Sequence, residues 1–213
     1  EKTTCAHSIW LVDEDLPIMA ECKATAVHCA LSNIRLGSGI SPVLKYIAQG
    51  VNVAFGCDGA ASNDGQDLLE AVKIGSLLHN VTDPDYRNWL TPQKSLHIAC
   101  KGAFAGVGLS KFVGEISVGQ HADFVLYDLT TLCVLPKTDP VGLILWGGRT
   151  SGAVESVWVA GRQIIDKGEF LTVDIKGLKA KLLAKSNWCA QPRDSPLFDE
   201  LEGPYRSVME LPQ

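Results

Sequence analysis

The chain has 213 residues, of which 46% are hydrophobic and 20% are charged, with 20 glycines and 10 prolines. This composition is typical of a globular protein with a buried core, and it excludes a disordered tail, a collagen-like repeat and a coiled coil. The 19 basic and 24 acidic side chains leave a net charge of −5, so the chain has no uniformly basic surface for nucleic acid. No apolar run reaches the roughly 18 residues of a membrane-spanning helix. We therefore expect neither a nucleic acid nor a membrane as a partner.

The seven cysteines are dispersed singly along the chain and never form a Cys-x-x-Cys pair. A structural zinc knuckle needs closer pairs, and a disulfide framework is typical of shorter secreted chains. The cysteines therefore predict reduced thiols in a cytoplasmic protein.

The first hundred residues alternate strand and helix signals. Short apolar segments predict strands over residues 3–11, 24–29 and 51–56. Helical spacing of apolar residues predicts helices over residues 13–19, 42–49 and 67–78. Strands separated by short helices form parallel sheets with right-handed crossovers, so the predicted fold class is α/β.

The strand–helix alternation ends in the second half of the sequence. Residues 92–107 predict one helix, with Leu96, Ala99, Cys100 and Ala103 on its inner face. Beyond it, residues 122–128 predict a strand, 154–165 a hairpin whose turn contains glycine, and 178–185 a helix. The last twenty residues hold prolines among charges and predict an irregular arm.

Three polar residues come at the predicted carboxyl ends of parallel strands: His7, His28 and Asp58. Ligands bind at this edge in α/β sheets and barrels, because loops and helix N-termini converge there. Asp58 could ligate a metal and accept a proton from water, or it could be an ordinary turn or N-cap aspartate. Either histidine could equally be a neutral side chain that bonds a backbone carbonyl. Spacing alone leaves both interpretations open.

A resemblance to a known family bears on this choice. It lies in residues 6–11, 27–33, 36–43, in Gly56-Cys57-Asp58-Gly59-Ala60-Ala61-Ser62-Asn63, and in residues 114–124. These motifs, in this order, closely resemble the amidohydrolase superfamily, and most nearly its branch of chlorohydrolases and nucleobase or nucleoside deaminases. The similarity runs from about Cys5 to Phe170.

The resemblance implies an α/β fold made of the C-terminal part of a metal-dependent TIM-like barrel and part of a small β-sandwich. Residues 1–110 would form the last three βα units of the barrel with the following helix. Residues 111–175 would form the sandwich portion, and residues 176–213 a C-terminal helix and the irregular arm.

The resemblance also implies a chemistry and the residues that carry it. A zinc ion, or another divalent metal such as iron, activates a water that attacks an electrophilic ring carbon of a small heterocyclic substrate. Asp58 matches the aspartate that ligates the metal and shuttles the proton, and His7 matches the histidine that holds the activated water or the developing charge. Ser62 matches a position beside the active site, and we expect it to hydrogen-bond on the leaving side. His28 matches a strand-seven histidine, which we expect to be structural, and Trp10 is positioned three residues after His7 to line the substrate pocket.

The chain also departs from the family. The His-x-His pair of the first strand and the histidine with a nearby glutamate of the fifth are absent from it. Catalytic zinc needs about three protein ligands, and a complete barrel takes roughly 250 residues. We therefore infer that this chain is the C-terminal half of a larger enzyme. We expect an N-terminal segment or subunit that completes the barrel, in what the resemblance implies is a homo-oligomer.

Two kinds of function follow. The first is a hydrolase, most simply a deaminase of an aminated nitrogen heterocycle, with a dechlorinating hydrolase of the same branch as the alternative. The second is a non-catalytic structural subunit that keeps the fold without a complete metal site. Retention of both His7 and Asp58 favours the enzyme, because a scaffold has no chemical need for an acid at a barrel mouth.

Overall fold

The structure is a computed structural model that describes residues 3–147 and 150–189. The chain divides into two compact units, Glu1–Leu171 and Thr172–Gln213. The second unit contributes one described helix, α9 (Ile175–Cys189), and the predicted irregular arm of the last twenty residues lies outside the described part of the chain.

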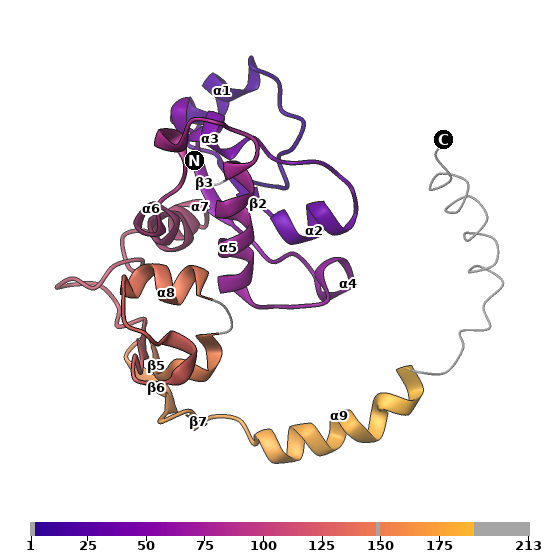
Figure 1. Cartoon of the computed structure of the whole chain (residues 1–213), viewed down its shortest axis with the longest axis vertical. Coiled ribbons are helices and arrows are strands. Elements are labelled where there is room, and N and C mark those ends of the chain that lie inside the picture. The colour runs from indigo at the N-terminus through magenta and orange to yellow at the C-terminus, as the bar shows by residue number, and fades with distance from the viewer. Residues whose placement is uncertain (1–2, 148–149, 190–213) are drawn as a thin grey trace. The chain divides into compact units, whose positions relative to one another are not determined.

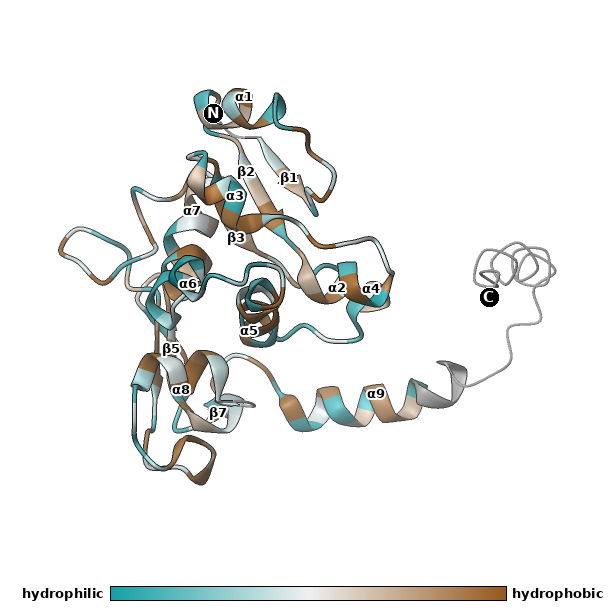
Figure 2. Cartoon of the chain, turned by 45° about the horizontal axis from the view of Figure 1, so that its top comes forward, coloured by the Kyte–Doolittle hydropathy of each residue, from teal (hydrophilic) through white to brown (hydrophobic). Residues whose placement is uncertain are grey.

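The first unit begins with a parallel sheet of three short strands in the order β1-β2-β3 (Figures 1 and 2). These are β1 (Thr4–Ala6), β2 (Thr25–His28) and β3 (Asn52–Phe55). Helix α1 (Asp15–Glu21) joins the first two strands, and α2 (Ala30–Arg35) and α3 (Val43–Ala48) join the second to the third. After β3 follow α4 (Ala60–Asn63) and α5 (Leu68–Leu77). This confirms the predicted parallel α/β arrangement, although α2 and α4 were not expected from the sequence.

One face of this sheet carries the hydrophobic core. Because alternate residues of a strand point to opposite faces, Ala26, Val53 and Phe55 project toward the helices. They pack there against apolar side chains of helices α1, α3 and α5. Every buried member of this core is at most 8% exposed. The helices contribute Leu16, Met19, Val43, Tyr46 and Val72. Burial of this apolar surface is the main source of stability for the sheet.

The other face of the sheet is crossed by one helical segment near the start of the strands. Thr4, Thr25 and Asn52 are register neighbours on this face. The Thr4 hydroxyl donates to the Gly106 carbonyl at 2.8 Å, and the Asn52 amide donates to the Gly102 carbonyl at 2.9 Å. Glycine at both positions lets the helix backbone come this close to the strands.

That segment corrects one sequence-based expectation. It runs without a break through α6 (Pro92–His97), a π-helical turn η3 (Ile98–Gly102) and α7 (Ala103–Gly106). The buried residues are Ser95, Ile98, Gly102 and Gly106, whereas Leu96, predicted to lie on the inner face, is 39% exposed. The buried residues keep helical spacing but lie one position from the predicted face, because Gly102 and Gly106 make the close contacts with the strands and apolar spacing does not single out glycine.

A second, antiparallel sheet completes the first unit. Its order is β4 (Phe124–Tyr127), β5 (Val154–Val159), β6 (Arg162–Asp166) and β7 (Glu169–Phe170). Ala160 and Gly161 both have positive φ, as the tight turn of the predicted hairpin between β5 and β6 requires. Helix α8 (Pro140–Trp146), which the sequence did not reveal, packs against α5 and α6. Helix α5 carries both polar and apolar residues (Figure 2), and Val72 and Leu69 are the ones that belong to or pack on the core.

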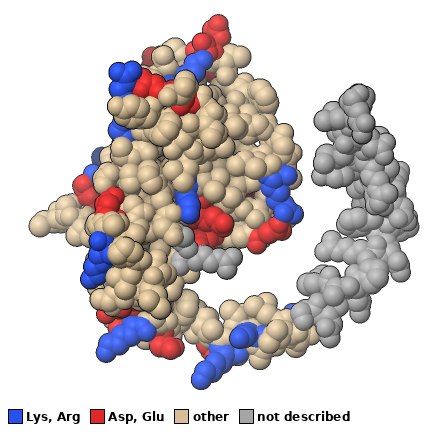
Figure 3. Space-filling model, viewed as in Figure 1, with Lys and Arg blue, Asp and Glu red and all other residues tan. Residues whose placement is uncertain are grey.

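Short 3₁₀ turns link these elements: η1 (Leu78–Asn80), η2 (Tyr86–Asn88), η4 (Leu132–Val134) and η5 (Thr150–Ala153). Basic and acidic side chains lie beside one another on the face drawn in Figure 3. Ion pairs of this kind include Arg35–Asp64 and Lys101–Glu115. Among the described helices, none is both long and apolar enough to cross a bilayer.

Two buried histidines lie against each other, His28 at the end of β2 and His79 in η1. His28 and His79 are each 1% exposed, and their ring centroids lie 5.3 Å apart. Neither ring nitrogen of His28 has a hydrogen-bond partner within the described part of the chain, nor has Nε2 of His79. Burial, with a smaller effect of His79, lowers the pKa of His28 to about 3, and burial lowers the pKa of His79 to about 4. Both side chains are therefore neutral in the fold.

This pair predicts a loss of stability in mild acid. Below pH of about 6.5 the unfolded chain protonates both histidines and the folded chain does not, so the free energy of unfolding falls with pH. Each histidine should contribute a decrease of about 2 kcal/mol between pH 6.5 and 5, measured by urea unfolding. His28→Leu should flatten this dependence, whereas Val81→Ala, which changes no titratable group at an exposed position, should leave it unchanged. An equal pH slope in all three proteins would contradict the prediction.

The close approach of Gly102 to β3 gives a second prediction. A Cβ at this position would overlap the Val53 carbonyl oxygen, which is backbone and cannot move aside. Gly102→Ala should therefore destabilise the fold by about 1–3 kcal/mol, although alanine in an open helical position is favourable. Thermal unfolding would measure the change. Gly152→Ala is the matched control, because nothing lies within 4 Å of a Cβ there, and it should be nearly neutral. A stabilised Gly102→Ala protein would refute the close approach.

Candidate functional site

The carboxyl ends of the parallel strands bring His7 and Asp58 together. His7 follows β1 directly, and Asp58 comes three residues after β3. His7 Nε2 lies 3.9 Å from Asp58 Oδ2, and the side chains are 42% and 30% exposed. A partly exposed imidazole and carboxylate, 51 positions apart in the chain, thus face each other at the sheet edge.

The backbone at both positions is in the left-handed region that L side chains rarely adopt. φ is 65° at His7, 45° at Ser8 and 64° at Asp58. Such conformations cost of order 1–3 kcal/mol and persist only where surrounding contacts enforce them. For His7 the enforcement is the buried Ser8, whose carbonyl accepts hydrogen bonds from the Tyr46 hydroxyl at 2.7 Å and the Ser41 hydroxyl at 3.0 Å. The core side of α3 therefore fixes the turn that presents His7.

Side chains of its own loop hold the turn around Asp58. The Gln66 amide donates to the Asp58 carbonyl at 2.9 Å, and the Asn63 amide donates to the Cys57 carbonyl at 3.0 Å. The Gly59 backbone N–H donates to Asp58 Oδ1 at 2.7 Å. These bonds fix the carboxylate as well as the loop that carries it.

Hydrogen bonds keep this carboxylate ionised. The Ser32 hydroxyl donates to Asp58 Oδ2 at 2.6 Å. This bond, followed by that of the Gly59 amide, lowers the pKa of Asp58 to about 2. Asp58 is consequently an anion throughout the neutral range, as a metal ligand or proton acceptor must be.

Two neighbouring residues of α2 reach the pair, and sequence reasoning had not assigned them a role. Besides the Ser32 bond, Asn33 Oδ1 lies 2.8 Å from His7 Nδ1. The strand order could have indicated them: β2 is the central strand, so the segment after it must lie between the loops that carry His7 and Asp58. In Figures 1 and 2, α2 lies beside α4, which it contacts.

The other residues singled out from the sequence lie around this pair in different settings. Ser62 is in α4 and its hydroxyl donates to the Gly59 carbonyl at 3.0 Å. Trp10 is 82% exposed, and its ring lies beside Gly39, where an added Cβ would come within 3.2 Å of it. His28 belongs to the buried pair with His79. The roles expected for these three residues remain predictions.

Zinc fits this site only as one part of a coordination shell. Asp58 offers an ionised, partly exposed carboxylate, which is a suitable ligand. Among the described residues, no three His, Cys, Asp or Glu side chains gather closely enough to hold a metal. The chain thus presents one of the roughly three protein ligands that a catalytic zinc ion requires.

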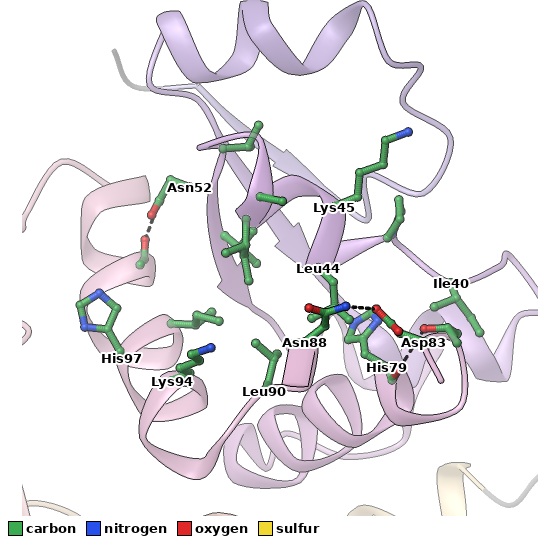
Figure 4. Close-up of a pocket in the computed structure, with 18 of the residues that line it drawn as sticks. Ile40, Leu44, Lys45, Asn52, His79, Asp83, Asn88, Leu90, Lys94 and His97 are labelled. Carbon is green, nitrogen blue, oxygen red and sulfur yellow. Dashed lines mark hydrogen bonds between the residues drawn. The ribbon is translucent and has the colours of Figure 1, made fainter. Parts of the chain in front are cut away.

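A separate cavity lies on another part of the first unit. It is a groove of about 910 Å³, lined by α3, the start of β3 and the segments from His79 to Gly102 (Figure 4). Lys45, Asp83, Lys94 and His97 are among its polar lining residues. The groove reaches β3 at Val51–Val53, whereas Asp58 follows the other end of that strand. Its lining contains neither His7 nor Asp58, so it is separate from the candidate site.

The sequence matches known proteins over most of its length. The profile of the amidohydrolase family matches residues 1–164. A 5-methylthioadenosine/S-adenosylhomocysteine deaminase of Pyrococcus furiosus is 37% identical over 86% of this chain and 43% of its own length. A 5'-deoxyadenosine deaminase of Methanopyrus kandleri is 32% identical over 87% of this chain and 42% of its own length. The chain therefore spans less than half the length of these relatives.

Solved structures agree with this match. An adenosine deaminase from Xanthomonas campestris with bound zinc superposes with a TM-score of 0.81 at 27% identity, over 86% of this chain and 42% of that one. The atrazine chlorohydrolase TrzN from Arthrobacter aurescens, complexed with zinc, gives a TM-score of 0.78 at 27% identity, over 85% of this chain and 40% of that one.

Proposed function

Because the chain belongs to the amidohydrolase family, we propose that it is the C-terminal catalytic part of a zinc-dependent deaminase. The reaction is hydrolysis of an aminated nitrogen heterocycle: water adds to the ring carbon, the carbon–nitrogen bond breaks and ammonia leaves. The observation that carries the proposal is the approach of His7 Nε2 to the ionised Asp58 carboxylate, 3.9 Å apart at the carboxyl edge of a parallel sheet.

In this proposal β1, β2 and β3 are the last three strands of a TIM-like barrel, and the antiparallel sheet is part of a β-sandwich. Support comes from the extent of the match, which covers 43% of the P. furiosus relative. A barrel has eight strands, so further polypeptide must pair with the outer edges of β1 and β3. That polypeptide would also supply the histidines that complete the zinc site.

The chemistry divides between the metal and this chain. When bound, zinc would act as a Lewis acid that lowers the pKa of a water molecule toward about 7. Asp58 would be one ligand, and its carboxylate would take the proton of the attacking water and pass it to the departing amine. His7, held 3.9 Å away, would stabilise the charge that develops on the ring as the water adds. Ser62, on α4, would turn its hydroxyl from the Gly59 carbonyl to donate a hydrogen bond on the leaving side.

The substrate class follows from the relatives and from Trp10. The named substrates of the curated relatives are adenosine compounds, whose purine ring presents a flat apolar face. Trp10 is largely exposed and lies three residues after His7. An exposed indole at this position suits stacking against a base, so we assign it to substrate binding.

We further propose a cytoplasmic homo-oligomer. The free thiols of Cys5, Cys22, Cys29, Cys57, Cys100 and Cys133 support the location, because such thiols persist in a reducing compartment. Light scattering of the purified assembly tests the oligomeric part, and a single copy of each polypeptide would refute it.

The function is tested on the assembly of this chain with the polypeptide that completes the barrel. Ammonia release from 5-methylthioadenosine, S-adenosylhomocysteine, 5'-deoxyadenosine and adenosine is measured beside chloride release from atrazine. Close to one zinc per copy and ammonia release from one of the nucleosides would support the deaminase. Chloride release alone would replace it by the chlorohydrolase alternative. A stable assembly without zinc or turnover would identify a structural subunit.

Asp58→Asn should lower kcat by about 10³-fold or more, because an amide neither accepts the proton nor ligates zinc well. The fold should persist, since asparagine tolerates the left-handed backbone found at residue 58. Asp64→Asn is the matched control: Asp64 also has positive φ and lies in the same loop region, but it pairs with Arg35. Its kcat should stay close to that of the parent, and an equal loss in both variants would contradict the assignment.

Trp10→Ala should raise KM about 10-fold and change kcat little, because stacking on a base contributes about 1–3 kcal/mol. Trp10→Phe should recover most of the affinity. Tyr86→Ala provides the control, since Tyr86 is another exposed aromatic residue, 72% accessible, in η2. Steady-state kinetics on the preferred nucleoside measure all three. An unchanged KM in Trp10→Ala would remove Trp10 from the substrate site.

A further inference from the structure

Two consecutive residues, Ser32 and Asn33, lie between the loops that carry Asp58 and His7. They belong to α2, which follows the central strand of the sheet, and they are 0% and 1% exposed. Successive helix residues point in different directions, so each reaches a different neighbour. Ser32 Oγ lies 2.6 Å from Asp58 Oδ2, and Asn33 Oδ1 lies 2.8 Å from His7 Nδ1.

The Asn33 contact determines which nitrogen of His7 carries the proton. In the amide orientation of the structure Asn33 turns its oxygen to the ring, and an amide oxygen accepts, so this arrangement favours the tautomer in which His7 Nδ1 carries the proton and donates to it. In the neutral imidazole Nε2 is then the bare nitrogen, and this is the atom that faces Asp58 Oδ2 at 3.9 Å. Hydrogen bonds to the distal nitrogen commonly fix the tautomer and orientation of a functional histidine.

The Ser32 contact orients the carboxylate in the same way. Oδ2 accepts from the Ser32 hydroxyl and Oδ1 accepts from the Gly59 N–H. Each carboxylate oxygen has two lone pairs, so each keeps one free for a ligand or a proton. Rotation of the Asp58 side chain would break both bonds.

We propose that Ser32 and Asn33 form a positioning pair for the reaction: Ser32 sets the orientation of the Asp58 carboxylate, and Asn33 sets the tautomer and orientation of His7. Because they are adjacent on one short rigid element, the distance between the two functional groups depends on α2. The proposal rests on the proposed function for its kinetic consequences, but its statement about the His7 tautomer is independent of any activity.

The first test is spectroscopic and needs neither zinc nor substrate. In the zinc-free assembly, with only this chain labelled with ¹⁵N-histidine, long-range proton–nitrogen correlations identify the protonated nitrogen of His7. The expected state is Nδ1–H in the parent and in Asn33→Asp, which keeps an acceptor, and a shift toward Nε2–H in Asn33→Ala. His7→Gln assigns the signals. An Nε2–H parent, or no shift in Asn33→Ala, overturns the role of Asn33.

The second test is kinetic. Asn33→Ala and Ser32→Ala should each lower kcat by about 10–100-fold with little change in KM, and Asn33→Asp should recover most of the loss at Asn33. Ser76→Ala and Asn52→Ala are the controls. Ser76 is equally buried but bonds only its own helix, and Asn52 makes two hydrogen bonds near the opposite end of β3. Both should lose stability and keep a kcat close to that of the parent.

The outcomes separate this proposal from the proposed function. Equal losses of kcat in the controls and in the α2 variants would mean that Ser32 and Asn33 act only through stability, which overturns the pair. A parent assembly without hydrolase activity would refute the proposed function, and the tautomer measurement would still decide the role of Asn33.

Discussion

The site depends on the parallel pairing of three short strands. In the register Thr4–Thr25–Asn52 the strands start at a common level, so their carboxyl ends emerge at one edge. His7 and Asp58 are 51 positions apart in sequence but only 3.9 Å apart in space for this reason. Helices on one face of the sheet bury the apolar residues that hold this register, and the segment containing Gly102 and Gly106 crosses the other face.

The same constraint explains why strained backbone persists at the site. His7, directly after β1, and Asp58, shortly after β3, both have positive φ, and their side chains approach each other at the sheet edge. The cost is balanced by bonds from buried groups, among them the Tyr46 hydroxyl on the Ser8 carbonyl. The candidate chemistry is thus coupled to the packing of α3 on the sheet, and a core substitution at Tyr46 would act on the geometry of His7.

Under the proposed function, the partial zinc shell and the open strand edges have a common origin. Three strands leave one edge of β1 and one edge of β3 open within the described sheet, and one carboxylate leaves a zinc shell unfilled. Open strand edges and unfilled shells are both satisfied by additional polypeptide. The match to less than half of each curated relative is consistent with a single missing partner for both.

The sequence by itself determined the strand–helix alternation, the hairpin around Gly161 and the candidates His7 and Asp58, because apolar periodicity, turn chemistry and a distinctive motif are local properties. Only the tertiary structure decided that Ser32 and Asn33 hold these two residues, since that depends on which strand is central. It also decided the buried face around Gly102, where glycines rather than apolar side chains meet the strands, and the burial of His28 against His79. Such contacts join residues far apart in the chain, and no local pattern encodes the distance between them.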